Sequence, residues 1–131
     1  MPLHRKLAIK SGQRLALLGA PLDFAIPDLP ESVRVRRSAR GPLDVIIAFF
    51  GDRAALERRL PALVRALRSD GSLWLVWPRK AAGHVSDVSE NLLRELVLPL
   101  GLVDVKVAAL DEDWSALRFV WRREMRERLR A

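Results

Sequence analysis

The feature that most constrains this chain is a strand–helix–strand pattern between residues 44 and 77. Residues 44–50 (DVIIAFF) form a β-branched and aromatic run, the strongest strand signal in the sequence. Leucines at 56, 60, 63 and 67 then recur at helical spacing, and residues 73–77 (LWLVW) form another apolar run. Two buried strands joined by a helix need a right-handed crossover, so the pattern predicts a parallel sheet.

The boundaries of this unit have local signals of their own. Asp52 can cap the helix, which we expect to run from residue 53 to about residue 68. Pro61 lies inside the leucine pattern and predicts a kink or a break into two short helices. Residues 69–71 (SDG) predict a helix stop and a turn. Trp74 and Trp77 lie within an apolar strand and are expected in the core rather than on a stacking surface.

Further strands are expected on both sides of this unit. Residues 14–20 (RLALLGA) predict a buried central strand, and the Val–Arg alternation of residues 33–37 predicts an edge strand. Prolines at positions 21, 27 and 30 exclude a long helix between them. Residues 102–110 and 115–122 predict a hairpin, with Val103, Val105 and Val107 on one side of its first strand and Asp104, Lys106 and Ala108 on the other.

A second helix is expected over residues 87–98, opened by a capping box of Asp87 and Glu90. The complete order predicts a single α/β domain with a six-stranded, mostly parallel, Rossmann-like sheet. We expect the strand order 2-1-3-4-6-5, ending in the antiparallel hairpin. Residues 1–123 form the expected domain, and residues 124–131 (EMRERLRA) form a basic C-terminal tail.

Composition excludes several classes of function. The chain has no cysteine, which excludes disulfides, cysteine nucleophiles and thiolate zinc sites, and its two histidines, His4 and His84, argue against a histidine-based metal cluster. No apolar run approaches the roughly 20 residues of a membrane-spanning helix, and no signal-peptide core is visible. We therefore expect a cytoplasmic protein without a metal site.

The net charge of +7 is concentrated at the two ends of the chain. Residues 1–42 hold eight Lys/Arg against three acids, and residues 121–131 hold five arginines against two glutamates, while the middle is almost neutral. Nucleic-acid binding through these Arg-rich ends is an alternative. It is not favoured, because no recognisable nucleic-acid-binding module accompanies the charge.

Two resemblances follow from these motifs. The Asp-led strand at residue 44, the amphipathic helix and the text DGSLWLV (residues 70–76) are similar to the second half of the Rossmann-like methyltransferases, over residues 44–123. The fold thus resembles a truncated methyltransferase fold. The chain also resembles a small bacterial family known only as a domain of unknown function, through residues 7–21, 73–83 and 89–124. That second resemblance implies a shared fold and role.

The first half of the chain departs from the methyltransferase pattern. Methyltransferases that use S-adenosylmethionine (SAM) carry a glycine-rich loop after the first strand and an acid at the end of the second. In this sequence Gly19 stands alone, and the second strand ends in Arg36 and Arg37. These departures lead to the expectation that no cofactor binds and that SAM in particular does not.

Ligands of open α/β sheets bind beyond the carboxyl ends of the strands, where the strand order reverses. Arg79 and Lys80, together with the free N–H groups near Asp87, could hold an anion there. The alternative is that this pair is a solvated loop. Trp114 could cover the pocket or pack on a helix. The candidate ligand-binding residues are Gly19, Asp52, Arg79, Lys80, His84, Asp87 and Trp114.

No Ser-His-Asp, paired-carboxylate or phosphate-loop signature is present, so no catalytic residue is assigned. The leading hypothesis is a non-catalytic domain that binds a small anionic ligand or a protein partner. The alternative is an enzyme with a strand-end active site, a degenerate or atypical relative of methyltransferases that uses Lys80, His84 or Asp87.

Overall fold

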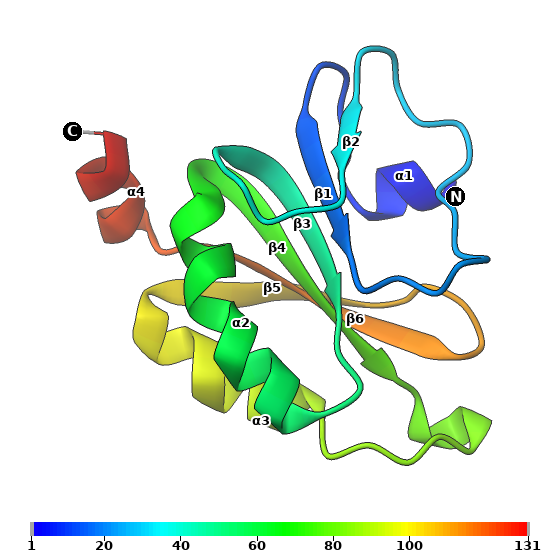
Figure 1. Ribbon diagram of the computed structural model, residues 1–131. Helices are drawn as coiled ribbons and strands as arrows, with labels where there is room; N and C mark the ends of the chain where they lie inside the picture. Colours follow the sequence, from blue (N-terminus) through cyan, green and yellow to red (C-terminus); the bar gives the residue numbers. More distant parts are fainter. Residues whose placement is uncertain (1, 131) are drawn as a thin grey trace.

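A computed structural model describes residues 2–130, and its six strands form one mixed sheet in the order β2-β1-β3-β4-β6-β5 (Figure 1). The first four strands along this order are parallel, and β6 is antiparallel to both β4 and the edge strand β5. The predicted fold and strand order are confirmed. The strands are β1 (Arg14–Leu18), β2 (Arg34–Arg36), β3 (Leu43–Phe49), β4 (Leu67–Pro78), β5 (Leu102–Ala109) and β6 (Trp114–Trp121).

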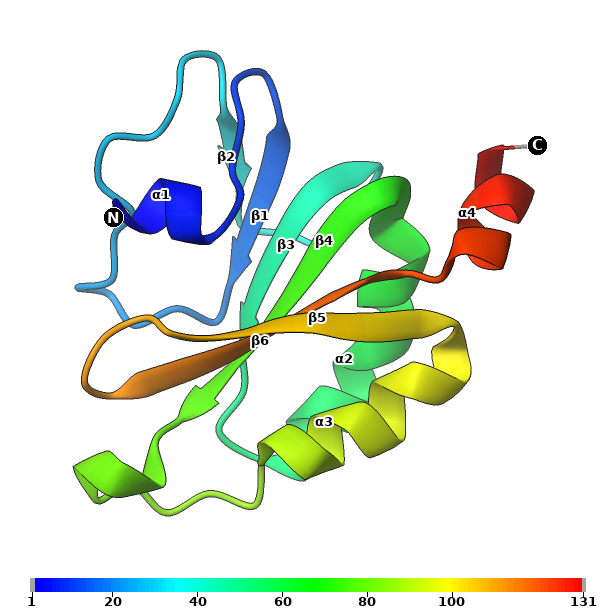
Figure 2. The same ribbon diagram turned by 180° about the vertical axis from the view of Figure 1, so that it is seen from behind.

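Helices cover the two faces of the sheet unequally (Figures 1 and 2). α2 (Arg53–Ala66) and α3 (Glu90–Val97) pack on one face, and the four-residue α1 (Leu3–Lys6) lies on the other. None of the helices formed by residues 2–130 has the length and apolar character that crossing a bilayer requires. Short 3-10 turns occupy Lys80–Ala82 and Leu98–Leu100, and α4 (Arg123–Arg130) follows β6.

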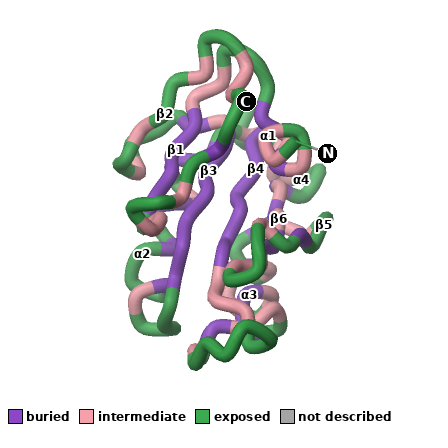
Figure 3. The backbone as a smooth tube through the Cα atoms, turned by 90° about the vertical axis from the view of Figure 1, so that its right-hand side faces the viewer, coloured by how far each residue is buried: buried purple, intermediate pink, exposed green. Residues whose placement is uncertain are grey.

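Alternation along the strands separates two cores, and the buried runs of β1, β3 and β4 form the centre of the molecule (Figure 3). On β3, Ile46 and Ala48 face α2 and α3, whereas Ile47 and its alternate neighbours face α1. Trp74 is fully buried on the α1 face, and its Nε1 donates a hydrogen bond of 3.0 Å to the Leu7 carbonyl. The expectation that Trp74 belongs to the core is confirmed.

The expected break at Pro61 does not occur, since α2 is one helix from Arg53 to Ala66. Proline has no backbone N–H, so the carbonyl one turn earlier in the helix has no hydrogen-bond donor there. Because Pro61 lies on the exposed side of the helix, that carbonyl can accept a hydrogen bond from water instead. The expected turn at residues 69–71 is also wrong, because β4 begins at Leu67 and includes these residues. Gly71 permits this path: a Cβ there would lie 2.9 Å from the Asp44 carbonyl oxygen.

The N-cap of α3 is Ser89 rather than Asp87. The Ser89 hydroxyl accepts a hydrogen bond of 3.2 Å from the Leu92 N–H, and the helix starts at Glu90. The Asp87 carboxylate is engaged elsewhere, because it accepts a 2.7 Å hydrogen bond from the backbone N–H of Arg53. The predicted capping box is therefore wrong, and Asp87 connects the loop before α3 to the start of α2.

A register shift between Asp104 and Lys106 changes the predicted faces of β5. Lys106 and Ala108 pair with Arg118 and Ala116 of β6, whereas Val107 pairs with Leu117 on the opposite face. Because Val105 is the extra residue of this irregularity, Val103 and Val107 face opposite sides of the sheet. The expected uniform valine face is wrong for this reason.

Candidate functional site

A cavity of about 480 Å³ opens where β1, β4 and β5 end, on the α1 face of the sheet. We call it the carboxyl-end pocket. Its walls come from α1, from the segment after β1, from the loop after β4 and from the β5–β6 turn. The lining residues are Leu3, Pro21, Asp23, Phe24, Ala25, His84, Leu110, Asp111, Asp113 and Trp114. The pocket thus lies at the edge of the sheet where ligands of open α/β folds bind.

A row of aromatic rings forms the apolar part of this pocket. Phe49, at the end of β3, contacts Phe24 and Trp114 edge to face, with ring centroids 5.0 Å apart in both pairs. The His84 imidazole stacks on Trp114 at 6.4 Å and 22°. Edge-to-face pairs of this kind hold rings in defined positions. The row therefore presents a fixed π surface to anything that enters the pocket.

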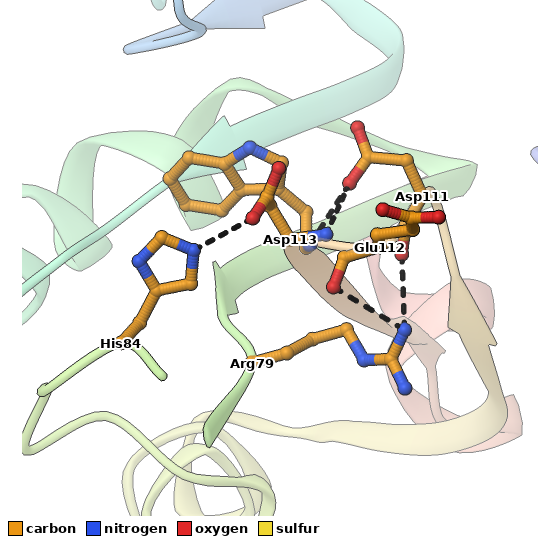
Figure 4. A network of polar contacts seen from close by, with 6 residues as sticks. Arg79, His84, Asp111, Glu112 and Asp113 are labelled. Atoms are coloured by element: carbon orange, nitrogen blue, oxygen red, sulfur yellow. Dashed lines mark hydrogen bonds and ion pairs between the residues drawn. The ribbon is translucent and has the colours of Figure 1, made fainter. Parts of the chain in front are cut away.

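The acidic β5–β6 turn and the loop after β4 hold each other in place (Figure 4). His84 Nε2 lies 2.9 Å from Asp113 Oδ1. The Arg79 guanidinium donates to the carbonyls of Asp111 and Glu112 at 3.2 and 3.4 Å, and the Arg79 N–H donates to the Asp113 carbonyl at 2.8 Å. Asp111 Oδ1 accepts from the backbone N–H groups of Asp113 and Trp114. These contacts fix the wall that carries the His84–Asp113 pair.

The structure brings only some of the predicted ligand-binding residues together. His84 and Trp114 line the carboxyl-end pocket. Lys80 and Arg79 line a neighbouring cavity of about 330 Å³ with Trp77 and the Ser89 end of α3. Arg79 therefore has two contacts: it lines this cavity, and its guanidinium donates a hydrogen bond to the β5–β6 turn.

The other three predicted residues lie outside the carboxyl-end pocket and have structural contacts. Gly19 follows β1 with φ +68°, and a Cβ there would lie 2.9 Å from the Phe49 carbonyl oxygen, so the site accepts no larger side chain without strain. Asp52 caps α2 through a 2.8 Å hydrogen bond from the Ala55 N–H. Asp87 bonds to the backbone N–H of Arg53, as described above.

Sequence reasoning missed Asp23, Phe24 and Asp113 as pocket residues. The first two lie in the proline-containing segment after β1, which has no periodicity to reveal which residues turn inward. Asp113 belongs to the connection between the two strands of the predicted hairpin, residues 102–110 and 115–122, and nothing in its spacing pointed to a further role. The one available signal was Trp114, an aromatic residue in that connection. Among residues 2–130, no group of three or more His, Asp or Glu side chains is arranged to hold a metal ion.

No family model matches the chain, and no curated protein matches its sequence. Solved structures, by contrast, share its fold. DhpI in its complex with SAH matches at a TM-score of 0.59 and 13% identity, over 92% of this chain and 82% of the other. A SAM-dependent methyltransferase from Aquifex aeolicus matches at 0.58 and 12% identity, over 88% and 85%. The mitomycin 7-O-methyltransferase MmcR matches at 0.61 and 13% identity, over 92% of this chain and 53% of its own.

These matches correct one expectation from the sequence. The lone Gly19 and the arginines at the end of β2 led to the expectation of no cofactor and no SAM, but the structures that share this fold over about nine tenths of the chain include a SAM-dependent methyltransferase and a complex with SAH. The two departures leave the order of the six strands intact. At these low identities the matches establish the fold alone: this chain has a methyltransferase-like scaffold.

Proposed function

We propose that this chain is an atypical methyltransferase-like protein that binds a SAM-type ligand in the carboxyl-end pocket. The observation that carries the proposal is the pocket itself, which combines aromatic rings with carboxylates at the ligand-binding edge of a methyltransferase-like sheet. The expected cytoplasmic location and the likeness to a small bacterial family are part of this proposal.

The chemistry of the pocket fits the positively charged part of such a ligand. A sulfonium or ammonium group is attracted both to aromatic faces and to carboxylates. Phe24 and Trp114 supply the rings, and the exposed Asp23 and Asp113 supply negative charge. Arg36, at the end of β2, offers no acceptor for a ribose hydroxyl. We therefore propose that the pocket recognises the cationic end of the ligand. Asp23 is the carboxylate assigned to this contact, because Asp111 and Asp113 already make hydrogen bonds within the β5–β6 turn and to His84.

The His84–Asp113 pair gives the pocket a group that can move a proton. When bound, SAM supplies an activated methyl group. Asp113 lies 2.9 Å from His84 Nε2 and so orients the imidazole, which leaves Nδ1 as the second ring nitrogen. From this position His84 would accept the proton that a hydroxyl or amine acceptor loses when it is methylated. The Trp114 ring lies nearly parallel to the same imidazole, with centroids 6.4 Å apart.

Calorimetric titration with SAM and with S-adenosylhomocysteine tests the binding. We expect the unmodified protein to bind, and Trp114→Ala and Asp23→Asn to weaken the affinity for SAM about tenfold, close to the strength of one cation–π or ionic contact. Asp70→Asn removes an exposed carboxylate of β4 outside the pocket and is the matched control. No binding by the unmodified protein, or equal weakening by the control, would contradict the proposal.

A second candidate is the predicted small anionic ligand, placed in the cavity that Lys80 and Arg79 border. Lys80 lies there near the N-terminus of α3, where unpaired N–H groups favour negative charge. Glu90 in the first turn opposes an anion, which makes this candidate the weaker of the two. Titration with inorganic phosphate decides it: Lys80→Gln should abolish binding, and an unchanged affinity rejects the site.

A further inference from the structure

The α1 face of the sheet carries a second feature on β5 and β6, which begins next to the carboxyl-end pocket at Ala109 and runs away from it. Three cations lie along it, and we call them the basic strip: Lys6, Lys106 and Arg118. Lys106 and Arg118 occupy directly paired positions of β5 and β6. Lys6 reaches the same strand from α1, because its Nζ donates a 2.7 Å hydrogen bond to the Ala109 carbonyl. The fold thus joins charge from the N-terminal segment to charge in the hairpin.

Paired residues with like charge on neighbouring strands repel each other. No internal contact offsets this repulsion, since none of the ion pairs formed among residues 2–130 uses a residue of the basic strip. Arg118 is half-buried, and its Nε donates a hydrogen bond of 2.9 Å to the neutral Ser72 hydroxyl. Burial lowers the pKa of Arg118, which means that its charge is poorly compensated in the free protein.

The surface around the strip is open. On this face the buried cluster ends at the Ala108–Ala116 pair, and the next two pairs along the hairpin, Lys106–Arg118 and Val103–Val120, lie beyond it. Seen from behind, β5 has no helix in front of it at this end (Figure 2). None of the cavities described above includes Lys106 or Arg118. A flat row of cations without a cavity suits an extended polyanion better than a small ligand, which needs a concave site.

We propose that the basic strip binds the phosphate backbone of a nucleic acid. Ala109, where Lys6 is anchored, and Lys106 are three strand positions apart, a span of about 10 Å. Phosphates of one strand wind around the helix axis and so lie farther apart than their rise of about 3.4 Å along it, which gives the strip room for about two neighbouring phosphates. Such contacts neutralise the unpaired cations and carry no sequence preference. Lys106 and Arg118 do not line the carboxyl-end pocket, so the proposal does not depend on a ligand there.

Fluorescence anisotropy with a labelled short single-stranded RNA and a labelled DNA duplex tests the proposal. We expect affinity to fall steeply between about 50 mM and about 200 mM salt, through counterion release. Lys106→Gln and Arg118→Met should each reduce the slope of log affinity against log salt by about 0.7 with a single strand, and the double variant by about 1.4. Methionine retains the apolar stem of Arg118, and thermal melting of each variant verifies folding.

Arg59→Gln is the matched control, because it removes an exposed cation from α2 on the opposite side of the sheet. Its slope should equal that of the unmodified protein. If the strip variants retain the full slope, the nucleic acid binds elsewhere and the proposal fails. It fails equally if inorganic phosphate or vesicles with anionic lipid bind with the same dependence on Lys106 and Arg118 while neither nucleic acid binds.

Discussion

The two faces of the sheet differ in how completely their polar groups are satisfied by the protein itself. On the α2/α3 face, both helices begin with a side-chain cap, Asp52 or Ser89. Arg94 of α3 donates to Asp104 of β5 and to Glu90, and the hydrogen bond to Asp104 is the main cause of the raised pKa of Arg94. The charged side chains named here are thus paired within the protein, although the buried Nε1 of Trp121 on the same face has no hydrogen-bond partner among residues 2–130.

The α1 face is covered by a single helical turn and the proline-containing segment after β1. Its aromatic row ends at an open pocket, and its cations Lys106 and Arg118 face each other without an acid. The comparison indicates that the α2/α3 face contributes most of the stability, whereas the α1 face leaves charged and aromatic side chains accessible to a ligand. Substitutions that compare the two faces test this difference directly.

Truncating one phenylalanine on each face gives the largest contrast. Phe119 is fully buried against the α2/α3 face, so Phe119→Ala should lower the free energy of unfolding by about 3–5 kcal/mol through lost contacts and a cavity. Phe24 is only half-buried, and Phe24→Ala should cost about 1–2 kcal/mol. Urea denaturation measures both. Equal losses would show that the α1 face is as important for stability as the other.

The next effect tests the buried hydrogen bond between the sheet and Leu7, the residue that follows α1. Trp74→Phe removes the indole N–H that bonds to the Leu7 carbonyl and leaves that carbonyl unpaired. We expect a loss of about 1–3 kcal/mol by urea denaturation, the usual cost of a buried group without its partner. Trp77→Phe, at the half-buried end of the same strand, is the control and should cost less. A larger loss in the control would refute this role for Trp74.

The strand order could be predicted from the sequence because burial leaves a strong pattern. Residues 44–50 and 73–77 are apolar on both faces, as buried parallel strands require, and turn residues separate the elements. Errors arose where one local signal competed with a contact distant in sequence. Asp87 had the spacing of a helix cap, but its carboxylate bonds to the start of α2 instead.

The candidate site was less predictable for a physical reason. Its walls combine segments without periodicity, so the approach of His84 to Asp113 depends on how two loops are held, by contacts such as those of Arg79. The alternation already placed Lys106 on the side of Ala108, but the irregularity in β5 moves Asp104 to the opposite face and so leaves the paired Lys106 and Arg118 without that acid beside them. A one-residue shift of this kind leaves no mark in the alternation of the sequence.

The α3 cap yields a smaller and well-defined effect. Ser89→Ala removes the hydroxyl that accepts the Leu92 N–H and should cost about 1 kcal/mol, whereas Ser89→Gly should cost only a few tenths, because glycine is tolerated at an N-cap. Thermal and urea unfolding of both variants measure the difference. If alanine and glycine cost the same, the hydroxyl of Ser89 does not cap this helix.

The smallest expected effect has the opposite sign. Lys106→Glu places an acid opposite Arg118 and replaces repulsion with attraction, so it should raise the free energy of unfolding by about 0.2–1 kcal/mol. Lys106→Gln removes the repulsion alone and should give about half of that gain. Both gains should shrink at high salt, because the pair is partly exposed. If Lys106→Glu destabilises the protein while Arg118 remains in place, Lys106 has a structural role and the α1 face is not held open for a ligand.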